Sequence, residues 1–292
     1  MRRFNLIGVP IDSVGRSGGT ELAPAALREL GVATALGAGD AGDLDVRIRG
    51  EKRDPTTGVL GSSDVLATTS TLRDAVARAL EAEERPFLLG GCCAELPGAL
   101  AGARDALGRI GLAYVDGHLD LYDGSTSPTG EAADMPVAVA LGRGPERWVE
   151  AAGGASLAVE DTALVGYRDQ VESLEHGMLQ PEELGPELTH VSVDELRVEG
   201  PRAVAERVAA ALSVAHFWLH LDVDVLDQDV FGATDYLLPN GMSWAELGDC
   251  LRPLASRSAL AGVSLACYNP EKDPGHRCGR ALVEALGAAF SG

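Results

Sequence analysis

Two short segments place carboxylates and an imidazole at alternate positions of the chain. Asp116, His118 and Asp120 are spaced by two, and Asp222 and Asp224 repeat that spacing further along. In an extended backbone, residues two apart point to the same side, so each segment directs its polar side chains toward one spot. Four clustered carboxylates would repel one another, and divalent cations remove that cost. Oxygen-rich ligands with one imidazole suit Mn²⁺ among the common ions.

Either motif taken alone also fits a solvent-facing loop at the end of a strand. Both motifs, however, end apolar runs that are typical of buried strands, IGLAYVD and FWLHLDVD. Two such motifs in the same setting favour a metal site over two unrelated loops.

The elements that must position these residues follow from the hydrophobic pattern. Seven apolar runs are typical of buried strands: residues 4–9, 86–91, 110–116, 163–168, 190–196, 217–224 and 262–268. Helices are expected over 63–84, 201–213 and 279–290, and after Ser243, where Glu246 completes a capping signal. This alternation predicts an α/β fold with a parallel sheet covered on both faces. In such folds ligands bind at the carboxyl ends of the strands, where both motifs lie.

The composition is that of a globular protein, and it excludes one large functional class. The chain has 292 residues, 46% of them hydrophobic, and 44 acidic against 24 basic side chains give a formal net charge of −20. A nucleic-acid binder needs a basic surface, and anionic membranes would repel this chain. No repeat or low-complexity linker divides the sequence, so a single domain over residues 1–292 is expected.

The cellular location is expected to be the cytoplasm. No stretch resembles a signal peptide or a transmembrane helix. The five cysteines are odd in number and lack the spacing of a disulfide framework or a structural zinc site.

Five segments together resemble the ureohydrolase family of arginases, agmatinases and formiminoglutamases. They are GVPIDSVGRSGGTELAPAALRELG, the glycine pair Gly90-Gly91, VDGHLD, HLDVDVLD and SLACYNP. The resemblance covers nearly the whole chain. It implies a three-layer αβα domain with a central, mostly parallel, doubly wound eight-stranded sheet. It also implies two divalent metal ions, usually Mn²⁺, a small cationic substrate, and assembly into homo-trimers or homo-hexamers.

The resemblance assigns roles to the five residues of the two motifs. Asp116 and Asp222 match the aspartates that bridge the two ions, and His118 and Asp224 match ligands of one ion. Asp120 matches a ligand of the other ion and lies beside the metal-bridging hydroxide that acts as nucleophile. Two metals that share a hydroxide lower the pKa of water and hold the nucleophile in place.

Cys93 stands where the family usually has a metal-binding histidine. In one interpretation the ligand is lost and a small buried residue remains. In the other, Cys93 is a thiolate ligand, which favours Zn²⁺, Fe²⁺ or Co²⁺ more than an imidazole does. A branch of the family that hydrolyses N-omega-hydroxyarginine also carries cysteine here.

Three further positions depart from the family pattern. Ala133 lies near the place of the arginase proton-shuttle histidine. Glu131 or Asp134 could act as acid or base instead, or could be exposed or helix-capping carboxylates. Cys267 replaces a glutamate that binds guanidinium in relatives and is expected to be a packed strand residue. Asp235 either contacts a cationic substrate or is a loop residue without that role.

The sequence thus predicts a metal-dependent hydrolase of a C–N bond in a guanidino, hydroxyguanidino or formimino compound. The predicted metal ligands are Cys93, Asp116, His118, Asp120, Asp222 and Asp224. Asp120 and Glu131 are the predicted catalytic residues. Glu131 and Asp235 are the predicted substrate contacts. A narrower alternative is an N-omega-hydroxyarginine hydrolase. A third is a ureohydrolase fold that has lost turnover and binds a ligand.

Overall fold

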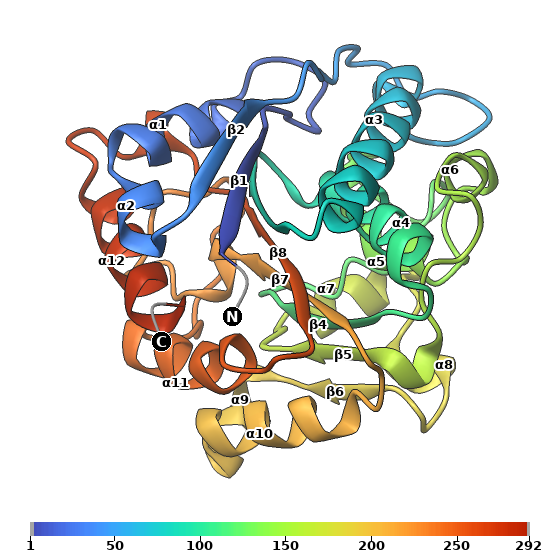
Figure 1. The fold of residues 1–292 in the computed structure, drawn as a ribbon. Coiled ribbons are helices and arrows are strands. Elements are labelled where there is room, and N and C mark those ends of the chain that lie inside the picture. The colour runs from blue at the N-terminus through green and yellow to red at the C-terminus, as the bar shows by residue number, and fades with distance from the viewer. Residues whose placement is uncertain (1–2, 291–292) are drawn as a thin grey trace.

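The computed structural model describes residues 3–290, and in this part of the chain a single parallel sheet forms the centre of the fold (Figure 1). Its eight strands have the order β2-β1-β3-β8-β7-β4-β5-β6, and every neighbouring pair is parallel. The strands are β1 (Phe4–Val9), β2 (Gly39–Asp43), β3 (Arg85–Gly90), β4 (Gly111–Val115), β5 (Thr162–Val165), β6 (Thr189–Val191), β7 (Phe217–Asp222) and β8 (Leu260–Ala266). The predicted eight-stranded parallel α/β fold is confirmed.

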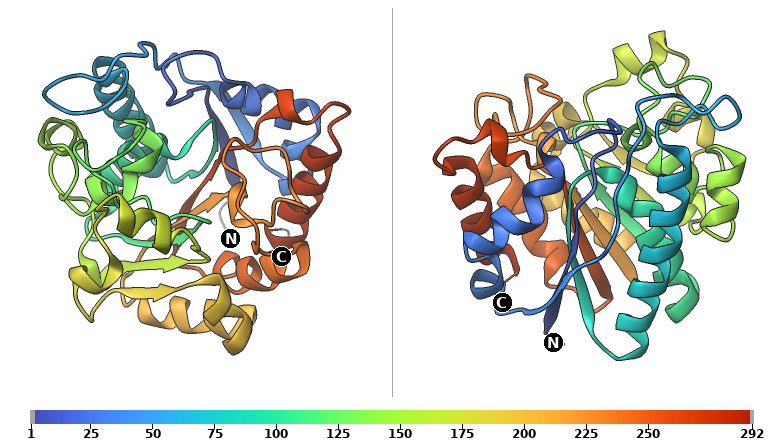
Figure 2. Two further views of the ribbon diagram at one scale, coloured as in Figure 1. Left: turned by 180° about the vertical axis from the view of Figure 1, so that it is seen from behind. Right: turned by 90° about the horizontal axis from the view of Figure 1, so that it is seen from above.

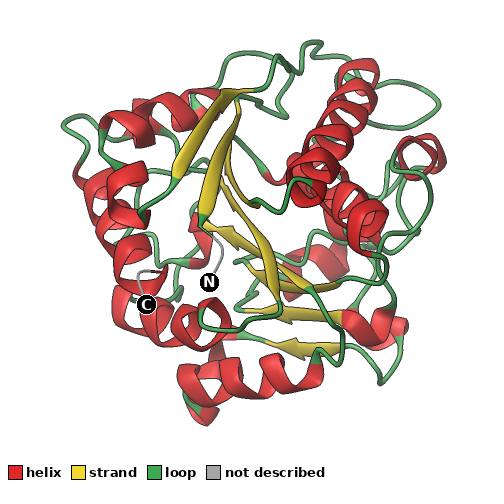
Figure 3. Cartoon of the chain, in the orientation of Figure 1, coloured by secondary structure: helices red, strands yellow, loops and turns green. Residues whose placement is uncertain are grey.

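Helices cover both faces of this sheet, as the view from above in Figure 2 shows. One face carries α1 (Ala23–Glu29), α2 (Val32–Leu36), α9 (Val193–Glu199), α10 (Pro201–Ala211), α11 (Trp244–Ala255) and α12 (Arg277–Phe290). The other carries α3 (Ser62–Glu81), α4 (Leu96–Leu107), α5 (Pro136–Ala140) and α6 (Glu146–Ala151). Two short helices, α7 (Gln170–Glu175) and α8 (Pro181–Leu184), follow β5 (Figure 3). Each face buries its own apolar core, which is the expected consequence of strands that are apolar on both sides.

The helix predictions agree with the structure to within a few residues. The expected helices 63–84, 201–213 and 279–290 correspond to α3, α10 and α12. The capping signal at the start of α11 is confirmed, because the Ser243 side chain accepts a hydrogen bond from the Glu246 backbone N–H while the Glu246 carboxylate accepts from Ser243. This reciprocal arrangement satisfies backbone donors that have no partner within the helix.

The strand predicted over residues 190–196 is wrong in its second half. The strand β6 ends at Val191, and the chain then enters α9. A capping box explains the switch: Ser192 accepts from the Glu195 backbone N–H, and Glu195 accepts from Ser192. The apolar residues after it therefore belong to a helix.

The sequence did not predict the strand β2, because this strand has no apolar run. Its sequence, GDAGD, is half-buried at the first residue and exposed at the other four. It pairs with β1 at the edge of the sheet, where a strand needs backbone partners on one side only.

The sheet order brings four strand ends together at its centre. The strands β3, β8, β7 and β4 are consecutive neighbours, and since all are parallel, their carboxyl ends lie at one edge. The two predicted motifs lie at the ends of β4 and β7, and Cys93 follows β3. None of the helices in the described part of the chain has the length and apolar character needed to span a bilayer.

Candidate active site

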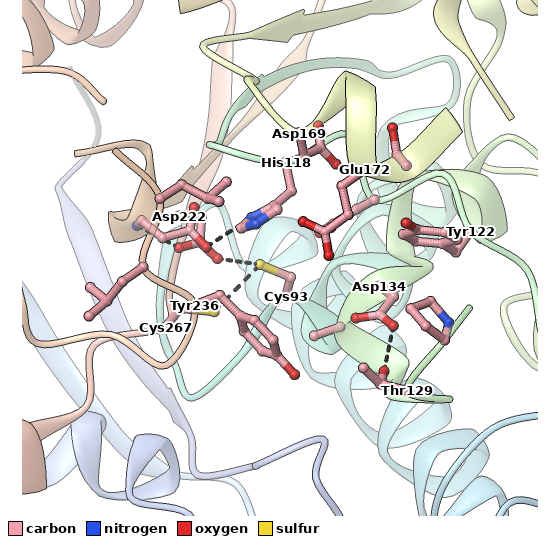
Figure 4. Close-up of a pocket in the computed structure, with 17 residues that line it drawn as sticks. Cys93, His118, Tyr122, Thr129, Asp134, Asp169, Glu172, Asp222, Tyr236 and Cys267 are labelled. Carbon is pink, nitrogen blue, oxygen red and sulfur yellow. Dashed lines mark hydrogen bonds and ion pairs between the residues drawn. The ribbon is translucent and has the colours of Figure 1, made fainter. Parts of the chain in front are cut away.

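The loops that leave β3, β4, β7 and β8 deliver their polar side chains to one place (Figure 4). Cys93 begins the short 3-10 helix η2 (Cys93–Glu95) after β3, and Cys267 directly follows β8. The β4 loop supplies Asp116 and His118, and β7 supplies Asp222 and Asp224. Of the residues with predicted metal roles, all but the half-buried His118 are buried.

A first group of donors surrounds the Cys93 thiol. Its Sγ lies 2.7 Å from Asp222 Oδ2, 3.8 Å from Asp116 Oδ2 and 3.3 Å from His220 Nε2. One donor atom from each of these four residues lies within 4.8 Å of the others. Cys93 is therefore placed where a ligand would be.

Sequence analysis missed His220, although a signal for it was present. His220 precedes Asp222 by two residues on β7, so the two side chains share a face of the strand. Burial lowers the pKa of His220 to about 4. The imidazole is therefore neutral at physiological pH, as a metal ligand must be.

A second group comprises Asp116, His118 and Asp224. His118 Nδ1 lies 3.1 Å from Asp224 Oδ2 and 3.6 Å from Asp116 Oδ1. The Gly117 backbone N–H donates to Asp224 Oδ1 at 3.1 Å and fixes that carboxylate. The two oxygens of Asp116 face different groups, so Asp116 is the residue that the two groups share.

The charges of these residues fit divalent cations. Burial raises the pKa of Asp116 and of Asp222, and the neighbouring Asp224 carboxylate raises both further. Burial opposes the charged form of His118, but the Asp224 and Asp116 carboxylates outweigh it and raise the pKa of His118. Carboxylates gathered in this way are stabilised by ions whose charge offsets their own. The donor set of carboxylate oxygens, imidazoles and a thiol matches known transition-metal ligands.

Asp120 lines the same cavity, and one of its carboxylate oxygens is bound by a neighbouring tyrosine. Its backbone is left-handed, with φ of 49°, and its Oδ2 accepts a hydrogen bond from the Tyr114 hydroxyl. The structure therefore does not bring Asp120 into either donor group. Its predicted roles as ligand and as catalytic residue stay predictions.

A cavity of about 270 Å³ opens above the donors. Besides Asp120, its wall includes three carboxylates outside the donor groups: Asp134, Asp169 and Glu172. Asp134 accepts hydrogen bonds from Ser127 and Thr129, both at 2.6 Å. Asp169 is buried, its Oδ1 has no hydrogen-bond partner, and burial raises its pKa to about 6. A buried acceptor without a partner points to a donor supplied by a bound molecule.

Cys267 also lines this cavity, which corrects its expected place within a strand. It follows the last residue of β8 in a left-handed conformation, with φ of 68°, and its Sγ lies 3.8 Å from Cys93 Sγ. Ala133 is a second small residue of the cavity wall. Neither position offers a carboxylate or an imidazole to a substrate.

The two residues with predicted substrate roles lie behind the cavity wall. Glu131 accepts from the Tyr236 hydroxyl at 2.8 Å and from Ser13 at 3.4 Å. Asp235 forms an ion pair with Lys272 at 2.6 Å and accepts from Asn269 at 2.8 Å. Tyr236 lines the cavity, whereas Glu131 and Asp235 are not among the described residues that line it.

Replacing Glu131 with Gln is expected to flatten the pH dependence of stability. Burial raises the pKa of Glu131 to about 7 from the ordinary 4.5. Between these values the folded state binds more protons than the unfolded state, so stability falls as pH rises. The free energy of unfolding should therefore drop less between pH 5 and pH 8 in Glu131→Gln than in wild type, by roughly 1–3 kcal/mol.

Denaturant titrations at the two pH values measure this difference. Glu146→Gln, the same change at an exposed position of α6, is the control and should keep the wild-type dependence. An unchanged slope in Glu131→Gln would show that Glu131 titrates normally.

Glu95 is a buried carboxyl beneath the site that has no partner. Neither of its oxygens has a hydrogen-bond partner, and the carboxyl packs against Gly90, where an added Cβ would lie 2.2 Å from Oε2. Burial, with a smaller contribution from Asp222, raises its pKa well above the ordinary range.

Replacing Glu95 with Met is expected to stabilise the metal-free protein by about 1–3 kcal/mol, because an unpaired buried polar group costs that much. The control is Glu95→Gln, which keeps the size and leaves the polar group unpaired, and which should give no gain. Chemical denaturation of the three proteins compares them, and destabilisation by Met would show that the carboxyl is satisfied.

Comparison with known proteins agrees with this geometry. The sequence model of the Arginase family matches residues 2–290. The chain belongs to the arginase family. An arginase of Bacillus subtilis is 28% identical to this family member, over 98% of the chain and 96% of the relative. Family membership makes the protein a metal-dependent hydrolase of the ureohydrolase type.

Solved structures show the same fold for this arginase-family chain. The arginase of Bacillus caldovelox superposes with a TM-score of 0.88 at 24% identity and covers 100% of this chain and 99% of its own. Formimidoylglutamase of Bacillus subtilis gives a TM-score of 0.75 at 17% identity, over 100% of this chain and 87% of its own. Enzymes named for different substrates share this fold, so the substrate has to be argued from the cavity.

Proposed function

We propose that the protein hydrolyses a C–N bond of a small cationic guanidino, hydroxyguanidino or formimino compound with the help of two divalent metal ions. The observation that carries this proposal is the pair of donor groups sharing Asp116 at the floor of a cavity with acidic walls. Relatives named arginase and formimidoylglutamase support the reaction class.

Each donor group would hold one ion. Cys93, Asp116 and Asp222 belong to the deeper position, and Asp116, His118 and Asp224 to the outer one. When bound, the ions act as Lewis acids and activate water for attack on the amidine carbon. Mn²⁺ suits the oxygen-rich outer position, whereas the thiol favours Zn²⁺, Fe²⁺ or Co²⁺ in the deeper one.

Carboxylates of the chain would transfer the proton and bind the cationic group of the substrate. Asp134 lines the cavity beside Ala133, and burial raises its pKa, so it can hold a proton for the leaving amine. Asp169 offers an unpartnered oxygen to a cationic group, and Glu172 lies on the same α7 segment of the wall. Glu131 acts on the cavity only through Tyr236, which it binds.

The wall also bears on the choice of substrate. Cys267 contributes a thiol where a carboxylate would form paired hydrogen bonds to a guanidinium. A plain guanidinium is thus held less well than in relatives with a glutamate there. N-omega-hydroxyarginine is a specific second candidate because Cys93 lies inside a donor group. The trimeric or hexameric assembly stays a prediction from the resemblance, and the cytoplasmic location stays a prediction from the sequence.

A substrate panel tests the proposal. Protein loaded with Mn²⁺ or Zn²⁺ is incubated with arginine, agmatine, other guanidino acids, N-omega-hydroxyarginine and formiminoglutamate, and release of urea, hydroxyurea or formamide is measured. At least one compound should turn over, and Asp169→Asn should raise its KM while the exposed control Asp229→Asn leaves KM unchanged. A metal-loaded protein that binds panel members without turning any over would favour the ligand-binding alternative.

A further inference from the structure

His220 occupies a position that the pattern of the two motifs does not explain. It is fully buried, and its Nε2 faces the Cys93 thiol at 3.3 Å. It comes from the same strand as Asp222, two residues earlier. Its donor atom lies within 4.8 Å of donor atoms of Cys93, Asp116 and Asp222.

Neighbouring residues fix the orientation of the His220 ring. Its Nδ1 lies 2.7 Å from Ser264 Oγ, and that oxygen accepts a hydrogen bond from Trp218 Nε1 at 2.9 Å. The ring stacks on Tyr114, with centroids 4.8 Å apart and planes 9° from parallel. When Nδ1 donates to Ser264, Nε2 presents its lone pair to the thiol. Metal-binding histidines are characteristically oriented by a hydrogen bond at the other ring nitrogen.

The same tyrosine binds the other candidate ligand, Asp120. The Tyr114 hydroxyl donates to Asp120 Oδ2, and Asp120 belongs to neither donor group. Tyr114 thus contacts both candidates for the fourth ligand: its ring stacks on the imidazole and its hydroxyl binds the carboxylate.

We propose that His220 is the fourth protein ligand of the deeper ion, together with Cys93, Asp116 and Asp222, and that this position selects Zn²⁺ over Mn²⁺. The inference rests on the metal centre of the proposed function and adds to it a ligand from β7. Cysteine sulfur, histidine nitrogen and aspartate oxygen are all ligands that Zn²⁺ binds in four-coordinate sites, whereas Mn²⁺ prefers oxygen-rich, octahedral sites.

The two positions then differ in what they can do. The deeper one has four protein donors and the outer one has three. Donors of both groups line the cavity: Cys93 and Asp222 of the deeper one, and His118 and Asp224 of the outer one. An ion with only three protein ligands would keep a position for water or substrate. The outer position is therefore the one with room for a further ligand.

X-ray absorption at the zinc edge tests the ligand set without removing His220. His118→Asn takes the imidazole out of the outer group, and the purified variant is loaded with one equivalent of Zn²⁺. The expected spectrum shows one sulfur and one imidazole bound to zinc. A spectrum with sulfur and oxygen alone, or one without sulfur, would overturn the proposal.

Metal titration gives a second measurement. His220→Asn should lower the affinity of the metal-free protein for Zn²⁺ by about 100-fold or more, since even loss of a residue that orients a ligand costs 10–100-fold. Ser264→Ala removes the contact that orients the His220 ring and should lower the Zn²⁺ affinity by about 10-fold. His190→Asn, at a half-buried histidine bonded to Tyr167, is the matched control and should leave it unchanged.

Selectivity is tested on wild-type protein dialysed against equal concentrations of Zn²⁺ and Mn²⁺. One equivalent of tightly held zinc per chain is expected, and retention of manganese alone would refute the selectivity. These readouts do not depend on turnover. Zinc bound through His220 in a protein that hydrolyses nothing in the panel would overturn the proposed function and leave this inference standing.

Discussion

Replacing Asp116 with Asn should remove both metal ions and lower kcat/KM by at least about 10²–10³-fold, the loss that follows removal of one electrostatic contact in an active site. Asp116 is the residue common to both donor groups, with Oδ2 facing Cys93 and Oδ1 facing His118. Asparagine keeps the shape but loses the charge, and its NH₂ group cannot bind a cation. Elemental analysis and steady-state kinetics on the best panel substrate measure the two effects.

Loss of activity in this variant should not come from unfolding. Burial and the Asp224 carboxylate raise the pKa of Asp116, so a neutral side chain suits this position when no ion is bound. The metal-free variant should therefore unfold at the wild-type denaturant concentration or above it. Asp229→Asn is the control, since it makes the same change at an exposed position of the β7–α11 loop and should keep both ions and full activity. A variant at position 116 that retained two ions would contradict the shared-ligand geometry.

Removal of the metal ions should destabilise the protein strongly. In the absence of cations, Asp116, Asp222 and Asp224 share one buried site. Ions that bind only the folded state stabilise it by about 2.7 kcal/mol when their free concentration is 100 times Kd. For a chain of this size we expect the midpoint of thermal unfolding to fall by several degrees on chelation and to recover when Zn²⁺ or Mn²⁺ is returned.

Calorimetry in chelator, and after addition of each ion, measures this shift. The Asp116→Asn variant serves as the matched control, because without the shared carboxylate its midpoint should respond little to either ion. Equal midpoints for wild-type protein with and without metal would mean that the donor groups do not bind ions in the folded state.

The fold and the metal-binding carboxylates could be predicted from the sequence because their signals are local. Apolar runs of strand length alternate with amphipathic helices, and this pattern specifies a parallel sheet between two helical layers. The position of Asp116 and Asp222 at the ends of β4 and β7 follows from the apolar runs, but the expected extended-chain alternation does not continue, because Asp224 lies in the 3-10 helix Val223–Val225 and belongs to a different donor group from Asp222. The edge strand β2 was missed because an exposed polar strand lacks this signature, and residues 192–196 were misassigned because a capping box overrode the apolar pattern.

Other features depend on contacts between distant parts of the chain, which only the tertiary structure decides. His220 meets Cys93 because β7 and β3 both flank β8, and no local spacing relates the two residues. The Asp120 carboxylate accepts a hydrogen bond from Tyr114 and lies outside both donor groups, which the spacing of the motif did not indicate.

The acidic wall of the cavity is likewise a product of the tertiary structure. Glu131 and Asp235 were expected to face the substrate, whereas the cavity is lined by Asp134 and by two carboxylates after β5, Asp169 and Glu172. Loops are placed by the elements they connect and by their own hydrogen bonds, so sequence distance from a motif does not predict which carboxylate reaches the cavity. The sequence by itself determined the sheet and the carboxylates at its strand ends, since period and hydrophobicity act within single elements. The tertiary structure decided which side chains meet there, because a ligand set depends on distances of a few ångströms between elements far apart in the chain.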